Sequence, residues 1–413
     1  MPSSRQIHLG VALDGAGWHP AAWRDPHSRP RELFAAEYWA DLAATAEHGL
    51  LDFATIEDTL ASPGPPGAAS EPAPTDRVRA RLDANLVAAR IAPTTTRLGL
   101  IPTITTTHTE PFHVSKALAT LDYTSRGRAG WQVRVSPSTQ EAGHFGRRQI
   151  PELDFRDPAS LLAAPVPEFV TDLFAEAADF VEVVRRLWDS WEDDAEIRDV
   201  ATRRFIDRGK LHHVDFQGRF FSVRGPSITP RPPQGQPVVT ALAHRDFAYE
   251  LAARTADLVF VTPGRETAAE LLTEVGTAAE RVGRAGEPLR VFADVVVFLD
   301  TDEQRGEARL RRLDDLAGHA LTSDAVVFAG SAAELADLLA VWSEQGVDGI
   351  RLRPGVAVDD LTAISSKLVP ELQRRGLFRT AYTASSLRGL LRLPVDVPNR
   401  YAATTSNGVQ PAR

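Results

Sequence analysis

Short apolar stretches and longer amphipathic stretches alternate along this chain from one end to the other. The short stretches have the length of buried strands, and the longer ones repeat apolar residues at three- and four-residue spacing, which is typical of helices. We expect strands at residues 7–13, 51–56, 98–104, 130–135, 237–243, 258–262, 291–299 and 349–352. We expect helices at residues 31–48, 77–92, from 111 onward, 168–191, 247–255, 266–282, 332–345 and 361–372.

This order of elements predicts the fold class. Strands that alternate with helices are joined by right-handed crossovers and form a parallel sheet. Eight strand-then-helix units indicate an α/β protein with a (β/α)8 TIM barrel, although the count alone leaves a large doubly wound sheet open. We expect one barrel domain over residues 1–375 and a C-terminal extension and tail over residues 376–413.

Three insertions interrupt the regular alternation. Residues 62–75 are rich in Pro, Gly and Ala and indicate a loop after the second strand. Residues 140–167 form a long connection after the fourth strand, where an active-site lid would lie. Residues 209–233 contain two short alternating runs around Gln217-Gly218, which predict a β-hairpin before the fifth strand.

The fourth expected strand carries the most informative pattern. Gln132 and Arg134 alternate with Trp131, Val133 and Val135. Because a strand has a period of two, the two polar side chains share one face and the apolar ones share the other. We expect Gln132 and Arg134 to point toward a solvated barrel mouth; an edge strand with one wet face is the alternative.

Composition narrows the class of protein. The net charge of the 413 residues is −9, and the basic residues are nearly all Arg, spread without a basic block, which argues against nucleic-acid binding. No apolar run approaches the ~20 residues needed to cross a bilayer, and the first residues lack the layout of a secretory signal. The chain has no cysteine, which excludes disulfides and thiolate chemistry. We therefore expect a cytoplasmic protein without a membrane partner.

Polar residues follow several of the expected strands, where a barrel places its active site. They include Asp14, Trp18, His19, Glu57, Asp58, Thr103, Thr105, Gln132, Arg134, His244, Arg245 and Thr262. Some have a structural alternative: Asp58 is a residue type that caps turns, His19 can pack on Trp18, and the threonines suit any strand. No ligand set with metal-binding spacing is present, and we expect no metal.

His244 and Arg245 give a sharper signal. They stand at the first turn of an expected helix, where free backbone N–H groups and basic side chains together suit an anion. Phosphate groups commonly bind near the later strands of these barrels. Surface charge at a helix start is the alternative, but positive charge there opposes the helix dipole unless an anion is bound.

The chain resembles the bacterial luciferase-like superfamily, in its nitrilotriacetate, dibenzothiophene-sulfone and long-chain-alkane monooxygenase branch. The resemblance covers roughly residues 5–402 and is carried by segments such as GWHPAAWRDP, LGLIPTITTTHTEPFHVSKALATLDYTSRGRAGWQV and SSLRGLLRLPVDVPNRYA. It implies reduced FMN (FMNH2) supplied by a separate NAD(P)H:flavin reductase. It also implies O2, a C4a-peroxyflavin that oxygenates a small or medium organic substrate, and a homodimer or homotetramer.

The resemblance also implies roles for single residues. Asp58 matches the acid that touches the flavin after the second strand, Thr105 matches a small hydroxyl beside the ring, and His19 matches the histidine of the first-strand loop. On this basis we expect His19 and Asp58 to be catalytic. The cofactor would be bound by Asp58, Thr105, Gln132, Arg134, His244 and Arg245.

Several flavin contacts of the family are exchanged in this chain. Gln132 replaces a family Asn and Val135 a Thr, and Val170 and Phe174 stand where the family carries a His and a Tyr. His244-Arg245 replaces a pair of phosphate-binding serines, and an arginine supplies a stronger, charge-assisted contact. Two alternatives therefore stay open: a deazaflavin-dependent oxidoreductase of the same fold, and a flavin-free relative that binds a ligand without turnover.

Overall fold

A closed barrel of parallel strands forms the centre of the protein. The computed structural model describes residues 6–62, 75–151 and 166–402. The barrel strands are β1 (His8–Leu13), β2 (Phe53–Ile56), β3 (Gly99–Thr105), β4 (Gly130–Arg134), β9 (Val238–Leu242), β10 (Leu258–Val261), β11 (Arg290–Leu299) and β13 (Gly349–Pro354). Each pairs in parallel with the next, and β13 pairs with β1 to close the ring. The predicted (β/α)8 fold is confirmed.

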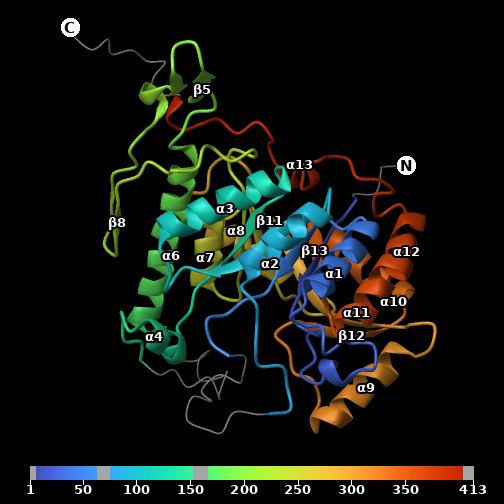
Figure 1. Ribbon diagram of the computed structural model, residues 1–413. Coiled ribbons are helices and arrows are strands. Elements are labelled where there is room, and N and C mark those ends of the chain that lie inside the picture. Colours follow the sequence, from blue (N-terminus) through green and yellow to red (C-terminus); the bar gives the residue numbers. More distant parts are fainter. Residues whose placement is uncertain (1–5, 63–74, 152–165, 403–413) are drawn as a thin grey trace.

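Helices surround the barrel (Figure 1). The crossover helices are α1 (Ala36–His48), α2 (Ala84–Ile91), α3 (Pro111–Ser125), α6 (Glu168–Asp189), α7 (Asp246–Thr255), α8 (Ala269–Arg281) and α10 (Ala332–Glu344). The last unit is α11 (Ala357–Ala363), the π-helical segment η5 (Ile364–Leu368) and α12 (Val369–Arg374). The short helical segments η1 (Ala22–Arg24), η3 (Ala92–Thr94), α4 (Thr139–Phe145) and η4 (Arg208–Lys210) lie in connections. None of the described helices is both long and apolar enough to span a membrane.

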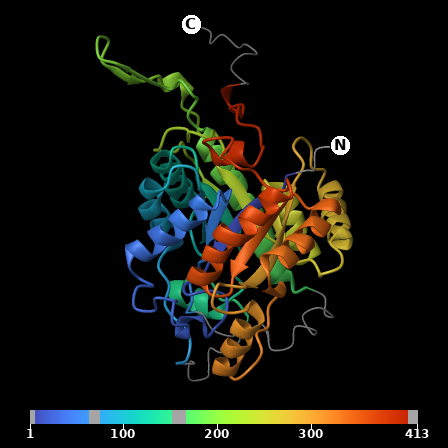
Figure 2. The ribbon, with the colours of Figure 1, turned by 90° about the vertical axis from the view of Figure 1, so that its right-hand side faces the viewer.

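Two small antiparallel pairs follow α6. The strands β5 (Glu196–Asp199) and β6 (Arg204–Ile206) form a hairpin that projects from the barrel (Figure 2). The strands β7 (Phe216–Gln217) and β8 (Ser222–Val223) form the second pair, in the region where one hairpin was expected. The sequence pattern did not predict the first pair. Most of the expected insertion at 62–75 and part of that at 140–167 lie outside the described residues.

The connection after β11 differs from the expectation. The sequence pattern placed the helix at 332–345 directly after this strand, but α9 (Gly306–Ala317) and β12 (Val326–Gly330) come between them. The first residues of β11 pair with β10 and its last five pair with β12. Because β11 is longer than β10, β12 pairs with the end of β11 that β10 does not reach and extends the sheet at the carboxyl end of the barrel.

Three helices begin later than predicted, among them α8, which was expected from residue 266 and begins at Ala269. The helix expected from residue 77 begins at Ala84, because the Asp83 side chain accepts the Leu86 amide hydrogen and caps it there. Residues 77–83 are not helical and run past the end of β1. The helix expected from residue 31 begins at Ala36.

Aromatic side chains fill the amino end of the barrel. Phe53, Phe260 and Phe292 pack together with ring centroids 5.6 to 6.1 Å apart. A Cβ at Gly10 would lie 2.3 Å from the Phe53 ring, so only glycine leaves room there. The short helix α13 (Leu387–Leu390) closes this end, and Leu387 is completely buried in the same cluster. The opposite, carboxyl end carries α4 and α9 (Figure 1).

Candidate active site

Gln132 points into the barrel, as the alternation along its strand predicts. Its Nε2 donates to Glu57 Oε2 at 2.9 Å and to Thr103 Oγ1 at 3.0 Å. Trp131 points the other way and packs on Phe180 of α6. Gln132 therefore joins the ends of β2, β3 and β4 from the inside.

A buried ion pair lies beside Gln132. The Arg351 guanidinium donates to both carboxylate oxygens of Asp294, at 2.8 and 2.5 Å, and to the side-chain oxygen of Gln132. Its Cζ lies 3.8 Å from the centroid of the Phe260 ring, on top of the aromatic layer. Arg351 and Asp294 are completely buried. A charge this deep is tolerated because both partners are fully hydrogen-bonded.

The same network extends toward the rim. Arg353 also binds Asp294, and its Nη1 donates to Asp324 Oδ1 at 2.6 Å. The Trp18 ring covers the Arg353 guanidinium at 4.5 Å. Asp324 in turn lies 3.3 Å from His244 Nε2. Burial raises the pKa of Asp324, but hydrogen bonds and charge from His244 and Arg353 outweigh burial and hold that pKa well below its ordinary value.

A second cluster forms the rim near β3 and β4. Arg134 pairs with Glu141 of α4 at 2.9 Å and donates to Thr105 Oγ1 at 3.0 Å. Thr59 Oγ1 donates to the same carboxylate at 2.6 Å. Burial raises the pKa of Glu141, but these donors outweigh burial and lower it overall. Arg134 is therefore neutralised by Glu141 rather than presented to the mouth as a free cation.

Asp58 lies beside this rim and is held by backbone amides. It accepts the N–H of Thr59 at 2.7 Å and that of Ala84, the first residue of α2, at 2.9 Å. Burial raises the pKa of Asp58 although the two amides oppose the rise. Asp58 thus fixes the start of α2 against the end of β2, and it keeps a proton to higher pH than an exposed aspartate does.

His19 is separated from these clusters. Its ring is buried, Nδ1 accepts the Ala21 amide hydrogen at 3.0 Å, and Nε2 lies 3.1 Å from Asp314 of α9. Burial lowers the pKa of His19 although Asp314 opposes the shift. Its neighbour Trp18 contacts the barrel network, whereas His19 ties the first-strand loop to α9.

His244 and Arg245 lie at the start of α7. His244 Nδ1 is 3.1 Å from Thr262 Oγ1 and its Nε2 faces Asp324, so both ring nitrogens have partners. The half-buried Arg245 guanidinium has no hydrogen-bond or ion-pair partner within the described residues. No side chain caps α7. Arg245 and the first amides of this ten-residue helix are therefore available to an anion.

The exchanged positions on α6 lie close to this anion site. The Phe174 ring meets the Phe247 ring of α7 edge to face at 4.6 Å, and Val170, one turn earlier, is buried. Val135 and Phe169 are half-buried, and both pack against a small apolar cluster. Apolar packing between α6 and α7 therefore replaces the polar groups that the resemblance leads one to expect.

The structure thus brings most of the expected site residues to one end of the barrel. Continuous side-chain contacts run from Gln132 through Arg351, Asp294, Arg353 and Asp324 to His244. Thr105, Arg134 and Asp58 form the adjacent rim, and His19 lies apart. Sequence reasoning missed Glu141, Asp294, Arg351 and Arg353. Arg351 and Arg353 alternate with apolar residues along β13, as Gln132 and Arg134 do along β4, so a signal for them was present. Their acidic partner Asp294 lies on β11, and the alternation does not show which strands supply partners.

One group of possible metal ligands is present in the described residues. Atoms of Asp25, His27 and Asp359 lie within 4.8 Å of one another. Arg312 already binds Asp25 at 2.5 Å, and Arg309 lies 3.4 Å from Asp359. Since both carboxylates have cationic partners, we assign no metal to them.

Comparison with known proteins places this geometry in a family. Residues 16–343 match the family described as luciferase-like monooxygenase. N-acetyl-S-(2-succino)cysteine monooxygenase of Bacillus subtilis is 30% identical over 96% of this chain and 99% of its own. Nitrilotriacetate monooxygenase component A of Aminobacter aminovorans is also 30% identical, over 95% of this chain and 98% of its own.

A solved structure agrees on the fold. The crystal structure of a long-chain alkane monooxygenase superposes with a TM-score of 0.80 over 97% of this chain and 99% of its own, at 23% identity. The family match spans more than half of the chain, and the relatives align over nearly their full length. The protein therefore belongs to the luciferase-like monooxygenase family.

Proposed function

We propose that this chain is the oxygenase component of a two-component FMNH2-dependent monooxygenase that oxygenates a small or medium organic substrate with O2. A separate NAD(P)H:flavin reductase would supply the reduced flavin. The observation that carries the proposal is Arg245, a guanidinium without a partner in the described residues, at the uncapped start of α7. The name "component A" of one relative supports a second component for that enzyme.

The residues at the mouth fit a phosphate-bearing cofactor. Arg245 and the first amides of α7 suit a phosphate, since charge-assisted hydrogen bonds to phosphate are among the strongest in proteins. Asp324 already binds His244, so Arg245 would provide most of the phosphate affinity and His244 a smaller part. Thr105, Gln132, Arg134 and Asp58 would border the ring, and Glu57 orients Gln132.

The chain's own contribution would be binding and positioning. Reduced FMN supplies the electrons that activate O2 for transfer of one oxygen atom to the substrate. The barrel wall and the rim clusters would exclude water, while fixed groups such as Gln132 and Asp58 would hold the ring and its developing charge. The buried Arg351–Asp294–Arg353 network keeps these groups in place.

Two alternatives remain distinguishable. The first is a deazaflavin, which is also a phosphate-bearing anion and would bind Arg245 equally well. Both compared relatives at 30% identity are named monooxygenases, which favours oxygenation over hydride transfer. Absorbance titration with each reduced cofactor separates the two. A flavin-free relative would bind neither FMN nor FMNH2 in calorimetry. We also propose a homodimer or homotetramer, which light scattering during gel filtration measures.

The experiment that tests the proposal follows O2 consumption, peroxide and oxygenated product with reduced FMN and candidate substrates. Asp58→Ala should lower product formation by about 100-fold or more, the usual contribution of a side chain that acts on the reacting group. Peroxide should persist, because reduced flavin still reacts with O2 when coupling is lost.

A matched control separates this role from the cap that Asp58 provides. Asp83→Ala removes the N-cap of the same helix but leaves Asp58 in place, so it should cost about 1 kcal/mol of stability and spare product formation. Asp58→Asn keeps an acceptor for the Ala84 amide but removes the carboxyl group, so it should lose product formation to the same extent as Asp58→Ala. Full turnover by Asp58→Asn would remove Asp58 from the site.

A further inference from the structure

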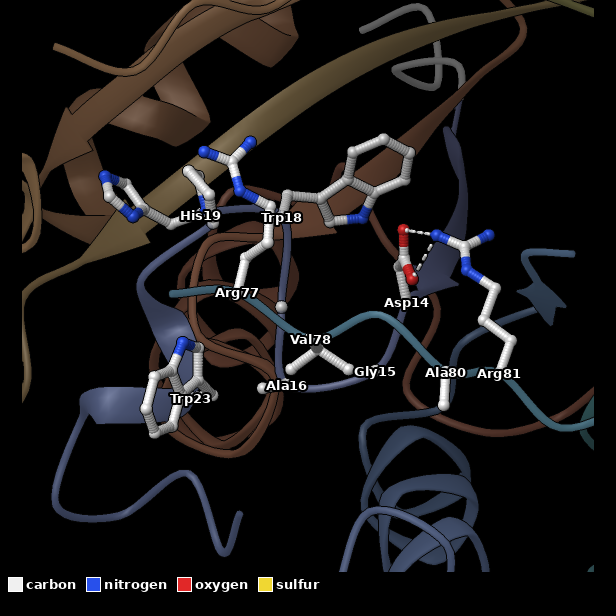
Figure 3. Close-up of a pocket in the computed structure, with 12 residues that line it drawn as sticks. Asp14, Gly15, Ala16, Trp18, His19, Trp23, Arg77, Val78, Ala80 and Arg81 are labelled. Carbon is white, nitrogen blue, oxygen red and sulfur yellow. Dashed lines mark hydrogen bonds and ion pairs between the residues drawn. The ribbon is translucent and has the colours of Figure 1, made fainter. Parts of the chain in front are cut away.

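A cavity of about 320 Å³ lies at the carboxyl end of β1, beside the rim (Figure 3). The loop after β1 forms one side and the segment 77–81 forms the other (Figure 3). Its walls include Asp14, Trp18, His19, Trp23, Arg77 and Arg81. The cavity borders the active-site rim, because Glu57 N donates to Leu13 O at 3.0 Å and so holds the end of β2 beside Asp14. It has the size of a small-molecule site.

The two arginines of this cavity have unused donors. Arg81 Nη2 binds both oxygens of Asp14, at 2.7 and 2.6 Å, but Arg81 Nε is buried and has no hydrogen-bond partner. Arg77 has only a long contact, 3.5 Å from its Nε to Asp76 Oδ1. The terminal nitrogens of Arg77 and Nη1 of Arg81 have no partner within the described residues. Since a guanidinium offers five donors, each arginine keeps donors to spare, Arg81 even beside its partner Asp14.

The aromatic walls offer the opposite chemistry. Trp23 Nε1 donates to Asp76 O at 2.8 Å and Trp18 Nε1 to Ala12 O at 3.4 Å. With their N–H groups engaged, both indoles present only their apolar surfaces to a ligand. The cavity therefore combines guanidinium donors that have no acceptor within the described residues with flat apolar walls.

We propose that this cavity binds the organic substrate and that the substrate carries a carboxylate next to an apolar, preferably planar, part. The carboxylate would accept from Arg77 and Arg81, and the apolar part would lie against Trp18 and Trp23. Two arginines suit a carboxylate because guanidinium and carboxylate pair in a bidentate manner. This inference rests on the proposed oxygenase function and adds the substrate class to it.

The phosphate of the cofactor is the other anion that would suit Arg77 and Arg81. It is assigned above to Arg245 on the other side of the mouth, at the end of β9, whereas Arg77 and Arg81 lie beyond β1 and β2. If the arginines at 77 and 81 held that phosphate instead, FMN and a carboxylate ligand would compete for them. The test therefore includes both ligands.

The experiment titrates the flavin-free chain with benzoate and with benzamide, its neutral counterpart, and follows tryptophan fluorescence. Benzoate should bind saturably and at least about tenfold more tightly than benzamide, the loss expected for a missing charged hydrogen bond. Trp23→Phe should reduce the fluorescence change. Benzoate affinity should be the same in the presence of saturating FMN.

Single substitutions test whether the two arginines bind the carboxylate. Arg77→Gln and Arg81→Gln should each weaken benzoate at least about tenfold and leave benzamide unchanged. Arg79 belongs to the same segment but does not line the cavity, so Arg79→Gln should stay close to the original affinity.

Four results would overturn the inference: no saturable binding of benzoate, equal affinity for benzamide, equal losses for Arg79→Gln and Arg77→Gln, or competition between FMN and benzoate. FMN binding is measured separately on the same protein. Failure of FMN binding would count against the proposed function and leave the carboxylate result standing.

Discussion

Asp294 binds two arginines at the centre of the barrel. Its carboxylate accepts from Arg351 and Arg353, and all three side chains are almost completely inaccessible to solvent. This triad connects the aromatic layer to the rim, since Arg351 lies on Phe260 and Arg353 binds Asp324. The position of the mouth residues therefore depends on one buried carboxylate.

Removal of this charge should be costly. We expect Asp294→Asn to lower the free energy of unfolding by about 3–5 kcal/mol, because the two buried guanidinium groups would then lose the one negative charge that they share. Denaturant unfolding followed by circular dichroism measures the change. As a control, Asp302→Asn removes a 94% exposed partner of Lys367 and should cost less than about 1 kcal/mol. Equal effects would contradict the importance of the triad.

At the residue scale, the sequence predicted orientation better than pairing. Period-two alternation placed Gln132 inside the barrel, where it binds Glu57 and Thr103. The same alternation did not reveal that Arg134 is neutralised by Glu141, since that acid comes from α4 in a stretch expected to be an irregular loop. Contacts between residues far apart in the chain depend on the closure of the barrel, which local patterns do not encode.

At the element scale, the C-terminal extension is part of the barrel. Helix α13 closes the amino end of the strands, and a Cβ at Gly99 would lie 2.4 Å from the Leu387 side chain. Arg388 of the same helix donates to the backbone oxygens of Gln236 and Pro394. The extension thus seals the core at the end opposite the site.

Helix α13 should contribute strongly to stability. We expect Leu387→Ala to lower the free energy of unfolding by about 2–5 kcal/mol, because the completely buried side chain would leave a cavity under the Phe layer. Val395→Ala, at a 63% exposed position in the same extension, should change it little. A similar, small effect of both substitutions would show that α13 packs loosely.

The first-strand loop should make stability pH-dependent through His19. Burial holds the pKa of His19 below the ordinary value of 6.5, so the unfolded chain binds more protons than the folded one near and below that pH. Stability is therefore lost as the pH falls through 6.5. The unmodified chain should be more stable than His19→Asn at about pH 8, and this difference in free energy of unfolding should become smaller as the pH falls to about 5.5. A difference that stays constant or grows would contradict the buried, neutral state.

The sequence pattern failed to predict elements that bury few residues. Helix α9 and strand β12 were missed. Only two of the five residues of β12 are fully buried, and α9 buries only three residues, Gly306, Arg309 and Leu313. The start of α2 was placed too early because the capping interaction of Asp83 was not recognised. Long apolar repeats such as that of α6 were placed closely, since they bury a continuous face.

At the scale of the whole molecule, the repeated strand-then-helix order was sufficient to predict the barrel. Right-handed crossovers leave few ways to arrange eight parallel strands with helices outside. The order did not specify how the mouth is filled, because the Arg351–Asp294–Arg353 network and the cavity beyond β1 each combine residues from different units. The fold was therefore predictable from pattern, and the chemistry of the mouth only in part.

The most direct test of the central claim is titration of the anaerobic protein with FMNH2, comparing the unmodified chain with Arg245→Ala and with Arg254→Ala. Arg254 is exposed at the other end of the same helix. The unmodified chain and Arg254→Ala should bind alike, and Arg245→Ala should lose about 1.5–3 kcal/mol of binding free energy, the range for a hydrogen bond to a charged group. Unchanged affinity in Arg245→Ala, or no binding of FMNH2 by the unmodified chain, would contradict the account.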